Sequence, residues 1–419
     1  MSLDKIRIYG GTSLHGEVEI AGSKNAALPL FALTAMAGKP CRLHNIPNLE
    51  DIANMVRILK ELGASVSVDG NTYTIDASHL TSFEAPYEIV RKMRASVVFL
   101  GPLLGKYGEA KVSLPGGCAI GVRPIDMHLK GFQALGATIT IEEGYVLAKA
   151  KQLRGCKFFF DKNTVLGTIN VMMAASYAEG ETILQNCAKE PEVVAVANAM
   201  RMMGVEISGD GTDTIRIIGR KTMNGFEIRN IPDRIETGTY MVAAAITRGD
   251  LLLKNTDAGM LDSVIAKLEQ TGTQVKVEKN QIHVKYIDSI LPCDIQTSPH
   301  PGFPTDMQAQ FVSLLCLAKG ESAVTETIFE NRFMHVPELC RMGANLKVEG
   351  STVHISGVQE LKGAPVMATD LRASASLILA GLVAQGTTEV LRVYHLDRGY
   401  ERMDLKLKNV GANIERVSD

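Results

Sequence analysis

Two kinds of apolar segment alternate along the chain. One is apolar on nearly every side, as in residues 26–37, and the other is amphipathic, as in residues 49–62. Both end near a glycine that precedes alternating residues typical of a strand, such as Val66-Ser67-Val68. Helices that are apolar all round must be buried. The pattern therefore predicts a unit of helix, strand, helix, strand and strand, with the apolar helices inside and the sheets outside.

This unit is repeated six times. The glycines that end the apolar segments are Gly38, Gly108, Gly180, Gly249, Gly320 and Gly386, and those that end the amphipathic segments are Gly63, Gly136, Gly204, Gly272, Gly343 and Gly411. Residues 6–10 (IRIYG) also resemble residues 215–219 (IRIIG), half a chain later. We therefore expect two similar domains of three units each, with a ligand site in the cleft between them.

Composition narrows the class of protein. A chain of 419 residues is long enough for two domains, and a net charge of −2 argues against nucleic-acid binding through bulk positive charge. The seven cysteines form no C-x-x-C pair, so neither a zinc site nor a disulfide framework is expected. No apolar run reaches the roughly 18 residues of a membrane span, and no signal peptide is visible. A cytoplasmic protein is expected.

Charged residues recur at equivalent places in the repeat. The positions 14 residues before the first glycine of each unit should be helix starts, and they are Lys24, Arg94, Leu166, Ile235, Asp306 and Arg372. Cations are disfavoured at a helix start unless an anion binds there. Arg123 and Arg398 share a second register, 13 residues before the later glycine, and Arg332 lies nearby. This basic set predicts a ligand that carries phosphate and carboxylate groups.

Three further residues allow two interpretations each. Asp306 fits a capping box of Thr305 with Gln308, but a carboxylate among cations is also placed to act as a general base. Asp370 reads first as a helix N-cap. Cys118 lies in a loop with Gly116, Gly117 and Gly121, where it is either an incidental thiol or, near arginine, a reactive one.

Seven motifs together resemble the UDP-N-acetylglucosamine enolpyruvyl transferase family over essentially the whole chain. They are residues 22–27 (GSKNAA), 94–96 (RAS), the Cys118 loop, 299–306 (PHPGFPTD), 330–335 (ENRFMH), 369–374 (TDLRAS) and 397–402 (DRGYER). The resemblance implies an α/β fold of two inside-out α/β barrels, each of three β-α-β-α-β-β repeats. It implies a domain of residues 22–229 that carries the Cys118 loop, a second domain of residues 1–21 plus 230–419, and an active site in the cleft between them.

The resemblance also implies roles for individual residues. Lys24, Arg123 and Arg398 would bind the phosphate of phosphoenolpyruvate, and Arg332 and Arg372 its carboxylate. Asp306 would be the base for the sugar 3-hydroxyl, and Cys118, the thiol that fosfomycin alkylates, would protonate the methylene carbon. The catalytic set is then Cys118, Asp306, Lys24 and Arg398. The remaining substrate contacts would be Asn25, Arg94, Pro124, Ile125, Asp126, Met127, Lys162, Thr164, Val165, Leu166, Ile328 and Asp370.

The implied reaction is the first committed step of peptidoglycan synthesis, with phosphoenolpyruvate and UDP-N-acetylglucosamine as substrates. It requires no metal or organic cofactor, and no obligate protein partner is expected. One departure concerns Leu166, which replaces a glycine of the family beside the nucleotide diphosphate, so weaker or altered acceptor binding is expected. Two alternatives stay open: a transferase that uses shikimate 3-phosphate, and a catalytically silent paralogue that binds the UDP-sugar.

Overall fold

The computed structural model describes residues 4–85, 87–90, 93–114 and 124–418. These residues form two compact units. Unit 1 consists of residues 4–21 and 232–418, and unit 2 consists of the described residues between 22 and 231. The second boundary between the units follows residue 231.

The described residues of each unit form three four-stranded sheets of one design. A first strand pairs in parallel with a second, and two further strands continue the sheet in antiparallel order. In unit 2 the sheets are β14 (Glu227–Arg229), β3 (Cys41–His44), β5 (Thr72–Asp76), β4 (Ser65–Asp69); β6 (Glu84–Ala85), β7 (Glu109–Ser113), β9 (Tyr145–Lys149), β8 (Thr138–Glu142); and β10 (Lys157–Phe159), β11 (Glu181–Gln185), β13 (Thr214–Ile218), β12 (Glu206–Ser208).

Unit 1 repeats this design with strands taken from both ends of the chain. Its sheets are β2 (His15–Glu19), β15 (Asp250–Lys254), β17 (Gln281–Lys285), β16 (Gln274–Glu278); β18 (Ile295–Gln296), β19 (Glu321–Thr325), β21 (Thr352–Ser356), β20 (Asn345–Glu349); and β22 (Pro365–Met367), β23 (Thr387–Leu391), β1 (Lys5–Tyr9), β24 (Asn413–Val417). Strand β1 lies between β23 and β24, with Ile8 opposite both Thr388 and Ile414. The N-terminal strands therefore complete unit 1.

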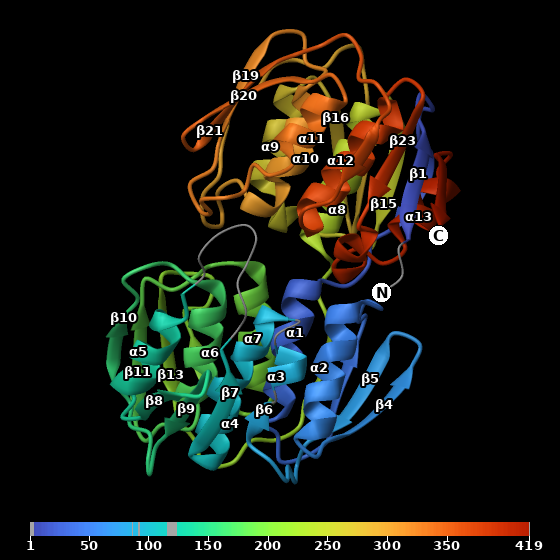
Figure 1. Ribbon diagram of the computed structural model, residues 1–419. Helices are drawn as coiled ribbons and strands as arrows, with labels where there is room; N and C mark the ends of the chain where they lie inside the picture. The colour runs from blue at the N-terminus through green and yellow to red at the C-terminus, as the bar shows by residue number, and fades with distance from the viewer. Residues whose placement is uncertain (1–3, 86, 91–92, 115–123, 419) are drawn as a thin grey trace. The chain divides into compact units, whose positions relative to one another are not determined.

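The inner helices of each unit are buried by the sheets around them (Figure 1). They are α1 (Lys24–Thr34), η1 (Arg94–Phe99) with α4 (Leu100–Tyr107), and α6 (Val165–Ala175) in unit 2, and α8 (Arg234–Ile246), η3 (Thr305–Met307) with α10 (Gln308–Leu315), and α12 (Leu371–Val383) in unit 1. Every residue of α8 is buried. This agrees with the apolar pattern of these segments and confirms the predicted α/β class with its helices inside.

The other helices include the amphipathic set. They are α2 (Glu50–Glu61), α5 (Asp126–Ala134), α7 (Pro191–Met202), α9 (Asp262–Gln270), α11 (Val336–Arg341) and α13 (Met403–Asn409), with short turns α3 (Tyr87–Val90), η2 (Ala258–Met260) and η4 (Val393–Arg398). The glycines after the six amphipathic helices all have positive φ, from 85° at Gly272 to 105° at Gly411. Glycine adopts this conformation without strain, which explains the repeated phrase. In the described part of the chain no helix is long and apolar enough to cross a bilayer.

Candidate functional site

The six positions predicted as helix starts are at helix starts. Lys24 and Arg94 are the first residues of α1 and η1, and the other four, Leu166, Ile235, Asp306 and Arg372, are the second residues of α6, α8, η3 and α12. Four of the residues that precede these helices cap them through side-chain oxygens: Ser23, Thr164, Asp233 and Asp370. Equivalent helix starts of the repeat therefore carry chemically different side chains.

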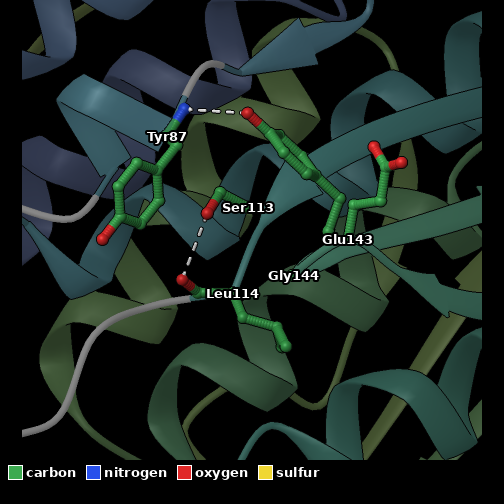
Figure 2. A pocket seen from close by; sticks show the side chains of 6 residues that line it. Tyr87, Ser113, Leu114, Glu143 and Gly144 are labelled. Atoms are coloured by element: carbon green, nitrogen blue, oxygen red, sulfur yellow. Dashed lines mark hydrogen bonds between the residues drawn. The ribbon is translucent and has the colours of Figure 1, made fainter.

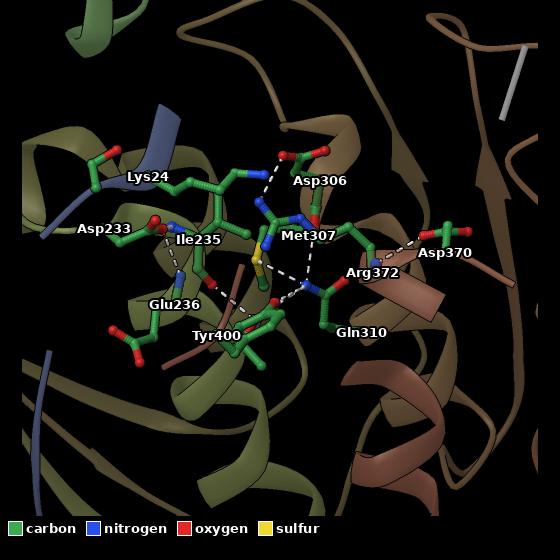
Figure 3. A network of polar contacts seen from close by, with 12 residues as sticks. Lys24, Asp233, Ile235, Glu236, Asp306, Met307, Gln310, Asp370, Arg372 and Tyr400 are labelled. Carbon is green, nitrogen blue, oxygen red and sulfur yellow. Dashed lines mark hydrogen bonds and ion pairs between the residues drawn. The ribbon is translucent and has the colours of Figure 1, made fainter. Parts of the chain in front are cut away.

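In unit 1, two arginines converge on one carboxylate. Arg332 Nη2 lies 2.7 Å from Asp306 Oδ1, and Arg372 Nη2 lies 2.9 Å from Asp306 Oδ2 (Figure 3 shows the Asp306 and Arg372 side chains). The arginine side chains are only 3% and 5% exposed, whereas that of Asp306 is 28% exposed. The cluster thus leaves its carboxylate, rather than its cations, open to an incoming group.

The two arginines control the protonation of Asp306. Burial alone would raise the pKa of this carboxyl, but the charges and hydrogen bonds of Arg372 and Arg332 hold it well below its usual value. Burial also opposes the charge of Arg372, yet the Asp306 carboxylate keeps the Arg372 pKa raised. The two arginines therefore keep the Asp306 carboxylate ionised and weakly basic.

The other predicted residues of unit 1 lie at helix ends and in a loop. Asp370 caps α12 by accepting hydrogen bonds from the Arg372 and Ala373 amides at 2.8 and 3.0 Å, as the N-cap interpretation predicts. Arg398 ends η4 and lies close enough to His395 for its charge, after burial, to lower the His395 pKa. Ile328 lies in an exposed loop. The structure thus brings Asp306, Arg332 and Arg372 into direct contact, and places Asp370 at the start of the helix that carries Arg372.

The predicted capping box of Thr305 with Gln308 does not form. Thr305 Oγ1 instead donates to Glu326 Oε2 at 2.8 Å, and both polar atoms of the Gln308 side chain are buried without a hydrogen bond among the described residues. Glu326 is 3% exposed and also accepts hydrogen bonds from Thr297 Oγ1 and the Ile328 amide. Sequence reasoning missed Glu326, which ties the start of η3 to the loop of Ile328.

In unit 2, the predicted residues lie at four helix starts. Lys24 Nζ is 3.4 Å from Asp51 Oδ2, Asn25 follows it in α1, and Arg94 begins η1. Pro124 and Ile125 lead into α5, which begins with Asp126 and Met127. Lys162 is exposed, Thr164 Oγ1 caps α6 by accepting from the Gly167 amide, and Val165 and Leu166 form the first turn of that helix.

A neutral buried cross-link joins three of these helices. Asn170 of α6 donates from Nδ2 to Val97 O in η1 and to His128 Nδ1 in α5, each at 3.0 Å, and its Oδ1 accepts from the Gly101 amide of α4 at 2.7 Å. Burial lowers the pKa of His128 to about 4, so the ring is neutral and Nδ1 accepts. The helices are closely packed here, since a Cβ on Gly101 would lie 2.2 Å from Asn170 O.

Two predicted residues, Cys118 and Arg123, lie outside the described residues, as does the side chain of Arg94. A hollow of about 450 Å³ borders Ser113 and Leu114, just before the Cys118 segment, and is also lined by Tyr87, Glu143, Gly144 and Tyr145 (Figure 2). None of these residues belongs to the predicted site. Within the described ranges, no group of three or more His, Cys, Asp or Glu side chains is arranged to hold a metal ion.

Comparison with known proteins identifies the class. The family described as EPSP synthase (3-phosphoshikimate 1-carboxyvinyltransferase) matches residues 8–407. The enolpyruvyl transferase NikO from Streptomyces tendae has a similar structure, with a TM-score of 0.91 and 25% identity over all of both chains. EPSP synthase from Acinetobacter baumannii shares the fold, with a TM-score of 0.79 and 19% identity over 99% of this chain and all of the other. The chain belongs to the enolpyruvyl (carboxyvinyl) transferase family.

Full-length relatives narrow this class. A protein of Geotalea uraniireducens named UDP-N-acetylglucosamine 1-carboxyvinyltransferase is 54% identical over 417 residues, which cover all of both chains. A protein of the same name from a Psychrobacter species is 51% identical over 99% of this chain and 97% of its own. The resemblance carried by the sequence motifs is thereby confirmed.

Proposed function

We propose that this protein transfers the enolpyruvyl group of phosphoenolpyruvate to the 3-hydroxyl of UDP-N-acetylglucosamine and releases phosphate. The observation that carries the proposal is the convergence of Arg332 and Arg372 on Asp306, in a chain so similar to proteins named for this reaction. Two guanidiniums suit the carboxylate of the donor, and the carboxylate between them suits the hydroxyl of the acceptor.

The reaction is an addition followed by an elimination. A proton adds to the methylene carbon of phosphoenolpyruvate, and the neighbouring carbon C2 becomes cationic. The sugar oxygen attacks C2 while its proton passes to Asp306. The bond from C2 to the phosphate oxygen then breaks, and loss of a proton from the new methyl group restores the double bond. The products are phosphate and the enolpyruvyl ether of the UDP-sugar.

Donor binding would activate Asp306. The donor carboxylate competes with Asp306 for Arg332 and Arg372, because both anions need the same guanidinium faces. When the arginines turn to the donor, Asp306 loses the interactions that hold its pKa low, and the pKa rises toward that of an ordinary carboxyl. Asp306 becomes a stronger base only after the donor is bound, which links hydroxyl deprotonation to the presence of phosphoenolpyruvate.

The other roles extend this proposal. Lys24, Arg123 and Arg398 bind the donor phosphate, and Cys118 protonates the donor methylene carbon. The starts of α1, η1, α5 and α6 bind the UDP-sugar, and their amides are suited to its diphosphate. The substrates are small molecules, no obligate protein partner takes part, and the reaction takes place in the cytoplasm.

Phosphate release tests the proposal. The assay supplies phosphoenolpyruvate alone, with UDP-N-acetylglucosamine, or with shikimate 3-phosphate. We expect release only with the UDP-sugar, and we expect it to fall after preincubation with fosfomycin if Cys118 is the reactive thiol. Release only with the shikimate compound would identify the protein as a transferase that uses shikimate 3-phosphate. Binding of the UDP-sugar without release under any condition would indicate a silent paralogue.

A further inference from the structure

A buried polar network lies against the carboxylate and arginine cluster of unit 1 (Figure 3). It joins Gln310 of α10, Thr239 of α8 and Tyr400, which follows η4. Gln310 Nε2 lies 3.1 Å from Thr239 Oγ1 and 3.3 Å from Tyr400 Oη, and Thr239 Oγ1 lies 2.8 Å from Tyr400 Oη. Gln310 and Thr239 are fully buried and Tyr400 is 2% exposed.

The direction of each hydrogen bond follows from the donors available. Thr239 donates its only hydroxyl proton to Ile235 O at 2.7 Å, so it accepts from its other neighbours. Tyr400 therefore donates to Thr239, and the tyrosine oxygen is left to accept from Gln310. The two N–H groups of Gln310 face three oxygens, so one of them is shared, and the shortest of the three contacts is to the main-chain oxygen of Asp306 at 2.9 Å. One side chain thus connects the Tyr400 hydroxyl to the backbone of the proposed base.

Tyr400 in turn contacts Arg372. The guanidinium carbon of Arg372 lies 5.4 Å from the centre of the Tyr400 ring, while its Nη2 donates to Asp306. The aromatic ring attracts the cation, and this attraction is strengthened where water is excluded. Because the ring contact does not use the Asp306 carboxylate, it can keep Arg372 oriented when Asp306 gives up its place to another anion.

The network is not required by the fold of the repeat. Thr239 and Gln310 each stand ten residues before the first glycine of their repeat, where the other four repeats have Leu28, Val98, Asn170 and Ser376. Gln310 also leaves its Oε1 atom buried without a hydrogen bond among the described residues, which costs stability. Because two repeats fill this position with leucine and valine, packing does not require a glutamine whose Oε1 has no hydrogen bond among the described residues. Its presence points to a role other than packing.

We propose that Tyr400 is a positioning residue that orients Arg372 toward the carboxylate of the donor, with its own ring fixed by Gln310 and Thr239. The inference rests on the proposed function, because it takes phosphoenolpyruvate as the ligand. Tyr400 does not touch the reacting atoms. It acts through Arg372, so its loss affects the donor and leaves the acceptor nearly unaffected.

The test compares three variants of the full chain with matched burial. Tyr400→Leu removes the ring, Tyr400→Phe removes only the hydroxyl, and Phe311→Leu removes another fully buried ring, from the same helix as Gln310. For Tyr400→Leu we expect the KM for phosphoenolpyruvate to rise about tenfold or more, and the KM for UDP-N-acetylglucosamine to change less than about twofold. Tyr400→Phe keeps the ring but loses its hydrogen bonds to Thr239 and Gln310, so it should raise the donor KM by a smaller factor than Tyr400→Leu. Phe311→Leu should lower the thermal midpoint without changing either KM.

Equal donor KM values for Tyr400→Leu and Phe311→Leu in an active protein would overturn the inference and leave the proposed function intact. The dissociation constant of phosphoenolpyruvate, measured by calorimetry, tests the inference even if the proposed function fails. If the wild-type protein binds the donor but transfers nothing, a tenfold weaker binding by Tyr400→Leu still supports the positioning role. A Tyr400→Leu variant that binds phosphoenolpyruvate as tightly as wild type would overturn it by the same measurement.

Discussion

The two units share one repeat but differ in how polar groups are held among their inner helices. In unit 1 the buried groups near the helix starts are ionic, with Asp306 between Arg332 and Arg372. Unit 2 also has an ion pair at a helix start, Lys24 with Asp51, but the tie that joins α6 to η1 and α5 is neutral, with Asn170 bonded to Val97 and His128. The same scaffold thus supports an ionic arrangement that an incoming anion can disturb and a neutral one that protonation of His128 can disturb.

This difference follows from solvation. Each charge of a buried ion pair is stabilised by the other charge. Removing or replacing one member therefore leaves the other buried and uncompensated. A buried amide and neutral imidazole satisfy each other without charge, and they become costly only when the imidazole is protonated. We infer that unit 1 is built to respond to its ligand and that unit 2 is built to hold helix starts in fixed register.

The largest effect is expected from a matched pair of substitutions, Asp306→Asn in unit 1 and Asp51→Asn in unit 2. Each removes a carboxylate that faces a helix-start cation. Asp306→Asn should lower kcat by about 10²- to 10⁴-fold, because the amide cannot take the hydroxyl proton. Asp51→Asn should change kcat by less than about threefold. Steady-state phosphate release measures both, and a similar loss of kcat in the two variants would remove the distinction between the units.

A smaller effect is expected from acid on unit 2. The pKa of His128 is about 4 in the folded chain and about 6.5 when unfolded, so the unfolded chain binds more protons between these values. Stability should therefore fall as the pH drops from 6.5 to 4, by about 3 kcal/mol from this residue. Urea unfolding at pH 7 and pH 4.5 should show a weaker pH dependence for His128→Gln than for wild type.

His335 of unit 1 is a control for that measurement, since burial also lowers its pKa to about 4. The His128→Gln variant retains His335 and should retain part of the acid sensitivity. A curve for His128→Gln that matches wild type at both pH values would show that the Asn170 tie does not respond to protons as we infer.

The smallest effect is expected from Leu166→Gly at the start of α6. Removing a half-buried side chain at this helix start should let the acceptor diphosphate approach the backbone more closely, and the KM for UDP-N-acetylglucosamine should fall a few-fold. The change should also cost about 1 kcal/mol of stability, because glycine weakens a helix. Acceptor KM from initial rates, together with the thermal midpoint, tests both; an unchanged acceptor KM would show that Leu166 does not limit binding.

The repeat made much of the fold predictable from sequence. Regular glycines gave the helix ends, and the apolar segments gave the inner helices, because both depend on local conformation and burial. The positions of Lys24, Asp306 and Arg372 at helix starts followed from the same register. A polar residue within an apolar helix, such as Asn170 or Gln310, was also visible in the repeat, and aligning the six units at that position would have identified both.

The contacts of these residues could not be predicted in the same way. Asp306 pairs with Arg332 and Arg372, and the second of these lies 66 positions away in sequence. Repeat spacing does not determine which side chains form such pairs. The capping box failed for a similar reason. Glu326, 21 positions away, is buried and accepts the hydrogen bond of the Thr305 hydroxyl. A buried carboxylate needs hydrogen-bond donors, so this contact forms instead of the local cap.

The place of β1 between β23 and β24 has a consequence for synthesis on the ribosome. All strands of unit 2 have been made once residue 231 has left the exit tunnel, so this unit can fold while the rest is translated. Strand β1, made first, must wait for residues 387–391 and 413–417 before its sheet can close. Residues 5–9 are therefore made before the other strands of their sheet and are among the last to find their partners. During that interval they present an unpaired strand edge to other chains.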